Sequence, residues 1–237
     1  MRRPLAAFLL LLLAGCAPPL AAQRLPVALD IGHSTAFPGA TSARGTPEFV
    51  FNRALADRID AALQALGVPT RIIGRAGERT DLVSRTRDAG NAALFLSIHH
   101  DSVQPHFLES WEHEGVVRAF SDRYAGFSLF VSRKNPRHAA SLRCASAIGQ
   151  SMRAAGFTPS LYHADPIPGE MKAFADRENG VHYYDNLVVL KTAAMPAVLF
   201  EAGVIVNRAE ELALQDDARR ERMARAIADG VAACTRR

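Results

Sequence analysis

The chain has 237 residues, of which 49% are hydrophobic, and a formal net charge of +4. This length allows one large α/β domain or two small ones, and the composition is ordinary for a protein with a sizeable core. Arg2 and Arg3 carry two of the excess positive charges. The small remainder argues against a nucleic-acid-binding protein, which needs a clustered basic surface. It is compatible with an anionic polymer as a partner.

The N-terminal residues have the pattern of a secretory signal. Two arginines precede an apolar run over 5–14, which is too short to cross a bilayer as a mature helix. The run ends in Leu13-Ala14-Gly15-Cys16, which resembles a bacterial lipobox, where cleavage precedes a lipidated cysteine. We therefore predict a lipoprotein-type signal peptide over 1–15, a tether over 16–26 and a folded domain over 27–237. A competing cut after Ala22 would release a soluble protein.

Only two cysteines, Cys144 and Cys234, follow Cys16. In an oxidising compartment two such residues can form a disulfide, and two buried free thiols are the alternative. The sequence has no Cys-x-x-Cys pair and no Cys/His cluster, which excludes a zinc finger.

Hydrophobic periodicity predicts strands that alternate with helices. The expected strands lie at 27–31, 68–73, 94–98, 127–131, 187–190 and 197–200. Helices are expected from 48 to the glycine at 67, from 80 to about 92, along the stripe 142–152, and at the C-terminus around 223–231. The segments 102–124 and 157–185 are expected to be irregular. This alternation predicts a single three-layer αβα domain with a mostly parallel twisted sheet.

Three of the apolar runs end in side chains that can bind a metal ion or transfer a proton. These side chains are His33, His99 and Glu201. In an open α/β sheet, ligands gather beyond the carboxyl ends of the strands. Catalytic zinc is commonly held by three protein ligands, with two histidines and a glutamate among the usual sets. Glu48 begins the first helix and is the candidate third ligand, so we predict a hydrolase with one zinc ion per chain.

The strand ends also indicate roles for the neighbouring residues. We assign Glu201 as general base, because a buried carboxylate without a partner would be costly; the alternative is that it caps the turn over 202–206. His99 and His100 point to opposite sides of an extended chain, so they should not both bind one ion, and either could be the ligand. Asp30 and Asp101 are candidate partners that orient a ligand imidazole, or turn formers. The histidines expected to be solvated or to contact substrate are His106, His113, His138, His163 and His182.

From about residue 27 to the C-terminus, the sequence resembles the amidase_3 family of zinc-dependent N-acetylmuramoyl-L-alanine amidases. The motifs that carry the resemblance are Asp30-Ile31-Gly32-His33 with Pro38-Gly39-Ala40, Glu48 with Asn52, Ser97-Ile98-His99, and Met195-Pro196-Ala197-Val198-Leu199-Phe200-Glu201-Ala202-Gly203 with Asn207. They are similar to the family's Asp-Pro-Gly-His-Gly-Gly…Pro-Gly-Ala, Glu-x-x-x-Asn, Ser-Ile-His and Pro-Ala-Val-Leu-x-Glu…Gly…Asn. The departures are Ile31, Ser34-Thr35 and Val206.

The resemblance implies that His33, Glu48 and His99 bind Zn²⁺ and that Glu201 is catalytic, so it favours His99 over His100. The implied reaction is hydrolysis of the amide between N-acetylmuramic acid and L-alanine in peptidoglycan, the implied partner. Some family members carry an inhibitory helix that a partner protein removes; 102–124 and 159–176 are the candidate segments here, and a protein activator is a candidate partner.

We expect an exported, periplasmic protein, anchored to the outer membrane if Cys16 carries a lipid. Two alternatives for its function are another zinc peptidase or amidohydrolase on the same scaffold and a non-catalytic cell-wall-binding lipoprotein.

Overall fold

The computed structural model describes residues 24–236. The predicted signal peptide, Cys16 and most of the tether lie outside these residues, and the predicted division of the chain is not tested. The strands are β1 (Val27–Ile31), β2 (Thr70–Ile73), β3 (Leu94–Asp101), β4 (Glu109–His113), β5 (Val116–Phe120), β6 (Ser128–Val131), β7 (Phe174–Asp176), β8 (Val181–Tyr183) and β9 (Ala197–Val204). The helices are α1 (Glu48–Ala65), α2 (Leu82–Asp88), α3 (His138–Ala154), α4 (Val188–Thr192), α5 (Arg208–Gln215) and α6 (Asp217–Thr235), with short 3₁₀ turns η1 (Pro105–Phe107) and η2 (Tyr162–Ala164). Within 24–236, no helix is long and apolar enough to span a bilayer.

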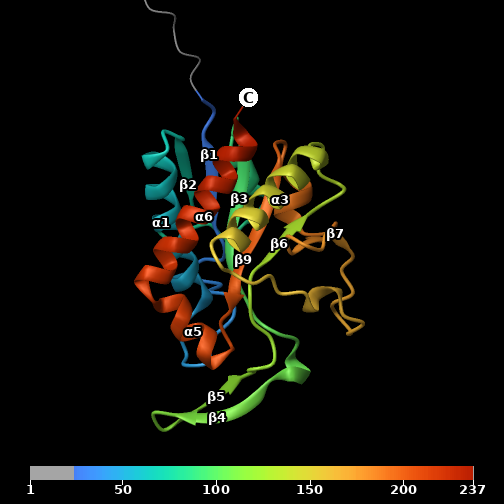
Figure 1. The fold of residues 1–237 in the computed structure, drawn as a ribbon. Helices are drawn as coiled ribbons and strands as arrows, with labels where there is room; N and C mark the ends of the chain where they lie inside the picture. The colour runs from blue at the N-terminus through green and yellow to red at the C-terminus, as the bar shows by residue number, and fades with distance from the viewer. Residues whose placement is uncertain (1–23, 237) are drawn as a thin grey trace, which may run out of the picture.

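Seven strands form one sheet in the order β2-β1-β3-β9-β6-β8-β7. The strands β2, β1, β3 and β9 are parallel to one another, whereas β6 is antiparallel to β9 and β7 is antiparallel to β8. Helices α1, α3 and α6 pack on one face (Figure 1), and the short helices α2 and α4 pack on the other. All five residues of β1 are buried, as expected for a parallel strand that is covered on both faces. The predicted three-layer, mostly parallel fold is confirmed.

Local chemistry sets the ends of the helices beside the sheet. Gly67 has a φ of 66° and follows α1, as predicted, because glycine adopts the left-handed conformation without a Cβ penalty. Asp81 precedes α2 and accepts hydrogen bonds from the backbone amides of Val83 (3.2 Å) and Ser84 (2.9 Å). These bonds satisfy two of the amides that a helix start leaves without partners.

The strand predicted over 187–190 is wrong, because this segment forms α4. A short buried apolar run does not distinguish a strand from a helical turn. Here the buried amide of Asn135 donates to the carbonyls of Leu190 (2.8 Å), Ala193 (3.1 Å) and Met195 (3.2 Å), and so satisfies the end of the helix. The irregular segments also contain β4, β5, β7 and β8, and α5 was not predicted.

The segment 102–124 follows β3 and forms the β4–β5 hairpin, which reaches away from the sheet (Figure 1). Trp111 holds the hairpin, because its Nε1 donates to the Ala43 carbonyl (3.0 Å) and its ring packs under the guanidinium groups of Arg44 and Arg208. The segment 159–176 contains η2 and β7. Neither segment contains an α-helix, so the inhibitory helix is not formed in either candidate place.

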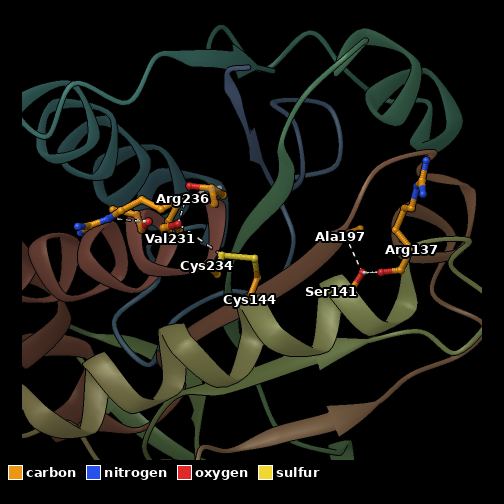
Figure 2. The surroundings of a disulfide bond; sticks show 9 residues. Arg137, Ser141, Cys144, Ala197, Val231, Cys234 and Arg236 are labelled. Atoms are coloured by element: carbon orange, nitrogen blue, oxygen red, sulfur yellow. Dashed lines mark hydrogen bonds between the residues drawn. A yellow bond between two sulfur atoms is a disulfide. The ribbon is translucent and has the colours of Figure 1, made fainter. Parts of the chain in front are cut away.

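Cys144 of α3 and Cys234 of α6 form a disulfide (Figure 2), so the first of the two alternatives for these cysteines is confirmed. The two helices approach closely, since a Cβ added at Gly230 would lie 2.5 Å from the Cα of Ile148. In the same view, Ser141 of α3 accepts a hydrogen bond from the first amide of β9 (2.9 Å). Helix α3 is therefore tied both to α6 and to a central strand.

Candidate active site

The strands β1, β3 and β9 are neighbours, so their carboxyl ends lie at one edge of the sheet. In the register of these strands, His99 of β3 pairs with Glu201 of β9. His33 follows β1, and the centroid of its ring lies 4.9 Å from that of His99. The convergence that the strand ends predicted is therefore observed. Two details differ: β3 continues to Asp101 and β9 continues to Val204, so His99 and Glu201 lie within their strands rather than at the strand ends.

Glu48 lies between the two imidazoles. Its Oε2 is 2.9 Å from Nε2 of His33, and its Oε1 is 3.0 Å from Nδ1 of His99. Donor atoms from the three residues lie within 4.8 Å of one another, and no other group of His, Cys, Asp and Glu within residues 24–236 is so arranged. Burial would raise the pKa of Glu48, but hydrogen bonds and charges from the two histidines lower it. The carboxylate therefore stays ionised, which is the form that binds a metal.

Two glycines provide the space that these three side chains occupy. A Cβ at Gly32 would lie 2.2 Å from Nε2 of His99, and a Cβ at Gly39 would lie 2.4 Å from Oε2 of Glu48. The side chains of His33 and His99 are 31% and 17% exposed, so the group opens to solvent. Many catalytic zinc sites have two imidazoles and one carboxylate as ligands and keep one side open. The residues present fit a zinc ion, so His33, Glu48 and His99 form a candidate metal group.

Asn52, one turn after Glu48 on α1, connects the carboxylate to the sheet. Its amide donates to Oε1 of Glu48 (3.1 Å) and to the Gly32 carbonyl (3.2 Å), and its Oδ1 lies 2.8 Å from Nδ1 of His100. His100 is buried against Phe51, and this burial lowers its pKa to about 3. The structure thus places His99 in the group and His100 in the interface between α1 and the sheet.

Glu201 has a carboxylate oxygen, Oε2, that is shielded from solvent and has no hydrogen-bond partner among the described residues. Burial raises the pKa of Glu201, and the negative charges of Asp101 and Glu48 raise it further. The alternative role as a cap of the following turn is not observed. Residues 202–204 continue β9, the amide of Val204 donates to Glu210 (2.8 Å), and the amide of Ile205 donates to the Asp101 carbonyl (2.9 Å). A buried carboxyl with a raised pKa beside a candidate metal group is typical of an acid/base residue.

Asp30 and Asp101 do not orient the imidazoles of the candidate metal group. Asp30 accepts hydrogen bonds from Nη1 of Arg85 (2.7 Å) and from Oγ of Ser97 (2.7 Å). The carboxylate of Asp101 lies 2.9 Å from Nε2 of His163. The expectation that either residue orients a ligand imidazole is wrong, because Asp30 is paired with Arg85 and Asp101 with His163.

The segment 159–176 supplies a buried polar cluster beside the site that the sequence analysis missed. The Tyr162 hydroxyl donates to Asp101 (2.8 Å), and Nδ1 of His163 lies 2.8 Å from Glu170. Burial would lower the pKa of His163, but the carboxylates of Asp101 and Glu170 raise it. His163 and His182 are both buried, so the expectation of solvated or substrate-contacting roles is wrong for them. No periodicity marks an irregular, proline-containing segment.

A mostly parallel sheet that presents two histidines, a helix-borne glutamate and a separate buried carboxyl at one edge is typical of metal-dependent hydrolases built on an α/β fold. The chain belongs to Amidase_3, the N-acetylmuramoyl-L-alanine amidase family, whose sequence model matches residues 27–233. A comparison with curated proteins found no match.

Solved structures of amidases have the same fold. Ami1 from Mycobacterium smegmatis is 22% identical, with a TM-score of 0.69 over 89% of this chain and 96% of that one. The catalytic domain of CwlV from Bacillus (Paenibacillus) polymyxa var. colistinus is 26% identical, with a TM-score of 0.66 over 88% and 97%. CwlD from Clostridioides difficile, in complex with the GerS lipoprotein, is 18% identical, with a TM-score of 0.62 over 89% and 98%.

Proposed function

We propose that this protein is a zinc-dependent N-acetylmuramoyl-L-alanine amidase that separates the stem peptide from the glycan of peptidoglycan. The observation that carries the proposal is the convergence of His33, Glu48 and His99 next to the buried carboxyl of Glu201. Membership of the amidase family supports the substrate class. The bond to be cleaved joins the lactyl carbonyl of N-acetylmuramic acid to the nitrogen of L-alanine.

His33, Glu48 and His99 would hold the metal ion. Zinc in such a site supplies Lewis acidity, which polarises a carbonyl and lowers the pKa of water. The partly exposed histidines mark the side from which substrate enters. Glu48 is the negatively charged member of the set and is fixed by the amides of Ala40 (3.1 Å) and His100 (3.2 Å), so the ligand geometry is built before substrate binds.

Glu201 would act as the base and then as the acid. Its carboxylate takes a proton from the attacking water, and the new C–O bond forms as the proton leaves. The same proton then passes to the amide nitrogen as the C–N bond breaks, which yields the amine of L-alanine and a lactyl carboxylic acid that then releases its own proton to solvent. A raised pKa suits this role, because it makes the Glu201 carboxylate a stronger proton acceptor than an ordinary glutamate. The charge of a bound cation would lower the pKa of Glu201 and so act against the effect of burial.

The test is digestion of purified peptidoglycan, with mass spectrometry of the released fragments and measurement of bound zinc. The wild type should release stem peptides with a free L-alanine amine, and a chelator should stop the reaction. Glu201→Gln should keep zinc and lose about 10²–10⁴-fold in rate. His99→Ala should lose zinc, whereas His106→Ala, at an exposed histidine, should match the wild type.

Two results would redirect the proposal toward the alternatives. Fragments that end elsewhere in the stem peptide would indicate a zinc peptidase on the same scaffold. A well-folded wild type that binds no zinc would indicate a non-catalytic cell-wall-binding protein. A Glu201→Gln variant with wild-type turnover would refute the assignment of the base.

We further propose that the protein is exported and carries a lipid on Cys16. The signal-like N-terminus supports export, and so does the disulfide, since disulfides persist in oxidising compartments. The complex of CwlD with the GerS lipoprotein supports the expectation of a protein partner. Mass spectrometry of the mature N-terminus would test the lipid, because an unmodified N-terminus after Ala22 would contradict it.

A further inference from the structure

Arg85 is a buried cation beneath the candidate metal group, and neither the family assignment nor the proposed mechanism gives it a role. Its side chain is 2% exposed. Its Nη1 donates to the carboxylate of Asp30 (2.7 Å) and to the Ile31 carbonyl (2.7 Å). Its Nη2 donates to the carbonyls of His33 and Arg79. One guanidinium therefore holds four acceptors, two of them in the turn that presents His33.

The backbone of His33 requires such support. Its φ is 68°, in the left-handed region that residues with a Cβ rarely adopt. Beyond the end of β1 the chain turns, and the carbonyls of Ile31 and His33 point to the guanidinium rather than to a neighbouring strand. Strained conformations persist where the surrounding structure fixes them. Arg85 is the side chain that binds the carbonyl of this residue directly.

The charge of Arg85 is balanced within the same buried cluster. Asp30 is 1% exposed, and its second carboxylate oxygen accepts from Ser97, which is fully buried. A buried ion pair is weak support for stability by itself, because desolvation offsets the attraction. What the cluster of Arg85, Asp30 and Ser97 does supply is a fixed orientation of the guanidinium, since α2, β1 and β3 each contribute one member.

We propose that Arg85 is a positioning residue for the metal site, which fixes the left-handed backbone of His33 so that its imidazole faces Glu48. This inference rests on the proposed function, in that the bound metal is zinc. Arg85 acts through the backbone of a ligand and does not touch the metal or the substrate. Residues that orient a ligand typically change metal affinity 10–100-fold when they are substituted.

The geometry explains why arginine is required rather than any cation. A guanidinium presents donors in a planar fork and reaches acceptors on both sides, whereas the ammonium of lysine is a compact point charge. Arg85→Lys keeps the charge opposite Asp30 but cannot reach the carbonyls on both sides of the fork. The substitution thus keeps the charge pair with Asp30 and removes the hydrogen bonds that support the backbone of His33.

The experiment measures zinc affinity of the full-length protein by competition with a chromophoric chelator, together with the thermal midpoint of the metal-free form. Arg85→Lys should bind zinc about 10–100-fold more weakly. The matched control is Ile148→Ala, on α3 at the opposite face of the sheet, which should lower the midpoint of the metal-free form and leave zinc affinity unchanged. Cobalt substitution gives a second readout, because the visible spectrum of Co²⁺ should differ in Arg85→Lys and match the wild type in the control.

The outcomes separate the inference from the proposed function. A wild type that binds no zinc refutes the proposed function. A wild type that binds zinc, with Arg85→Lys equal to it in affinity and in cobalt spectrum, refutes the positioning role. If Arg85→Lys does not fold, Ser97→Ala is the second variant, because it frees one oxygen of Asp30 and should weaken zinc binding in the same direction. Unchanged affinity in Ser97→Ala would then overturn the inference.

Discussion

Breaking the disulfide between Cys144 and Cys234 is expected to destabilise the fold strongly. The two cysteines are 90 residues apart. In the chain-entropy model, closing a loop of that length lowers the entropy of the unfolded state and raises its free energy by about 4.6 kcal/mol at 25 °C. For a domain of this size, that loss corresponds to a fall in the thermal midpoint of roughly 9–18 °C. The variant Cys144→Ala/Cys234→Ala removes only two sulfur atoms from the contact between α3 and α6, so it isolates the effect of the cross-link.

The assay is thermal and urea denaturation of both proteins, with and without a reductant. Reductant should lower the midpoint of the wild type to that of the double variant. The double variant has no bond to reduce, so reductant should leave its midpoint unchanged. A wild type as stable as the double variant without reductant would refute the reasoning, because the unfolded state would then gain no freedom when the loop is opened.

Two further substitutions test the site and its surroundings. Gly32→Ala places a Cβ 2.2 Å from Nε2 of His99, so we expect a folded protein with much less bound zinc by elemental analysis, and full zinc content would contradict the close approach. The carboxylates of Asp101 and Glu170 raise the pKa of His163 above 6.5, so its protonated form stabilises the native state below that pH and this stability is lost as pH rises through the raised pKa. In urea denaturation the free energy of unfolding of the wild type should therefore fall relative to His163→Gln as pH rises from about 6 to 9, and a difference that stays constant with pH would be inconsistent with a charged His163.

The sequence was sufficient to predict the strands that carry the site. The runs over 27–31, 94–98 and 197–200 are continuously apolar, which is typical of parallel strands that are buried on both faces. Because such strands end at one edge, their last residues could be expected to meet. Glu48 could be added since it starts a helix with a clear apolar period. These inferences use local patterns only.

The residues that the sequence analysis missed depend on contacts between distant segments. Arg85 belongs to a short helix and reaches Asp30, 55 residues earlier, and nothing in its neighbourhood distinguishes it from an exposed arginine. Tyr162 and His163 lie in an irregular segment and find Asp101 about 60 residues earlier. Buried polar partners of this kind leave no periodic signal, because only one position in each segment is involved. They are therefore visible only in three dimensions.

The geometry of the sheet explains why no compact motif could define the metal group. Adjacent strands lie about 4.8 Å apart. His33 follows β1 and His99 lies near the carboxyl end of the neighbouring β3, and the centroids of their rings are 4.9 Å apart. One carboxylate can bridge that interval, as the two oxygens of Glu48 do. The lengths of the connecting helices and loops do not enter this distance, so they are free to vary. What must be kept is the order of strands, the glycines that make room, and the support beneath His33. A search for fixed sequence spacings between the ligands would therefore miss this site, whereas the order of neighbouring strands predicts it.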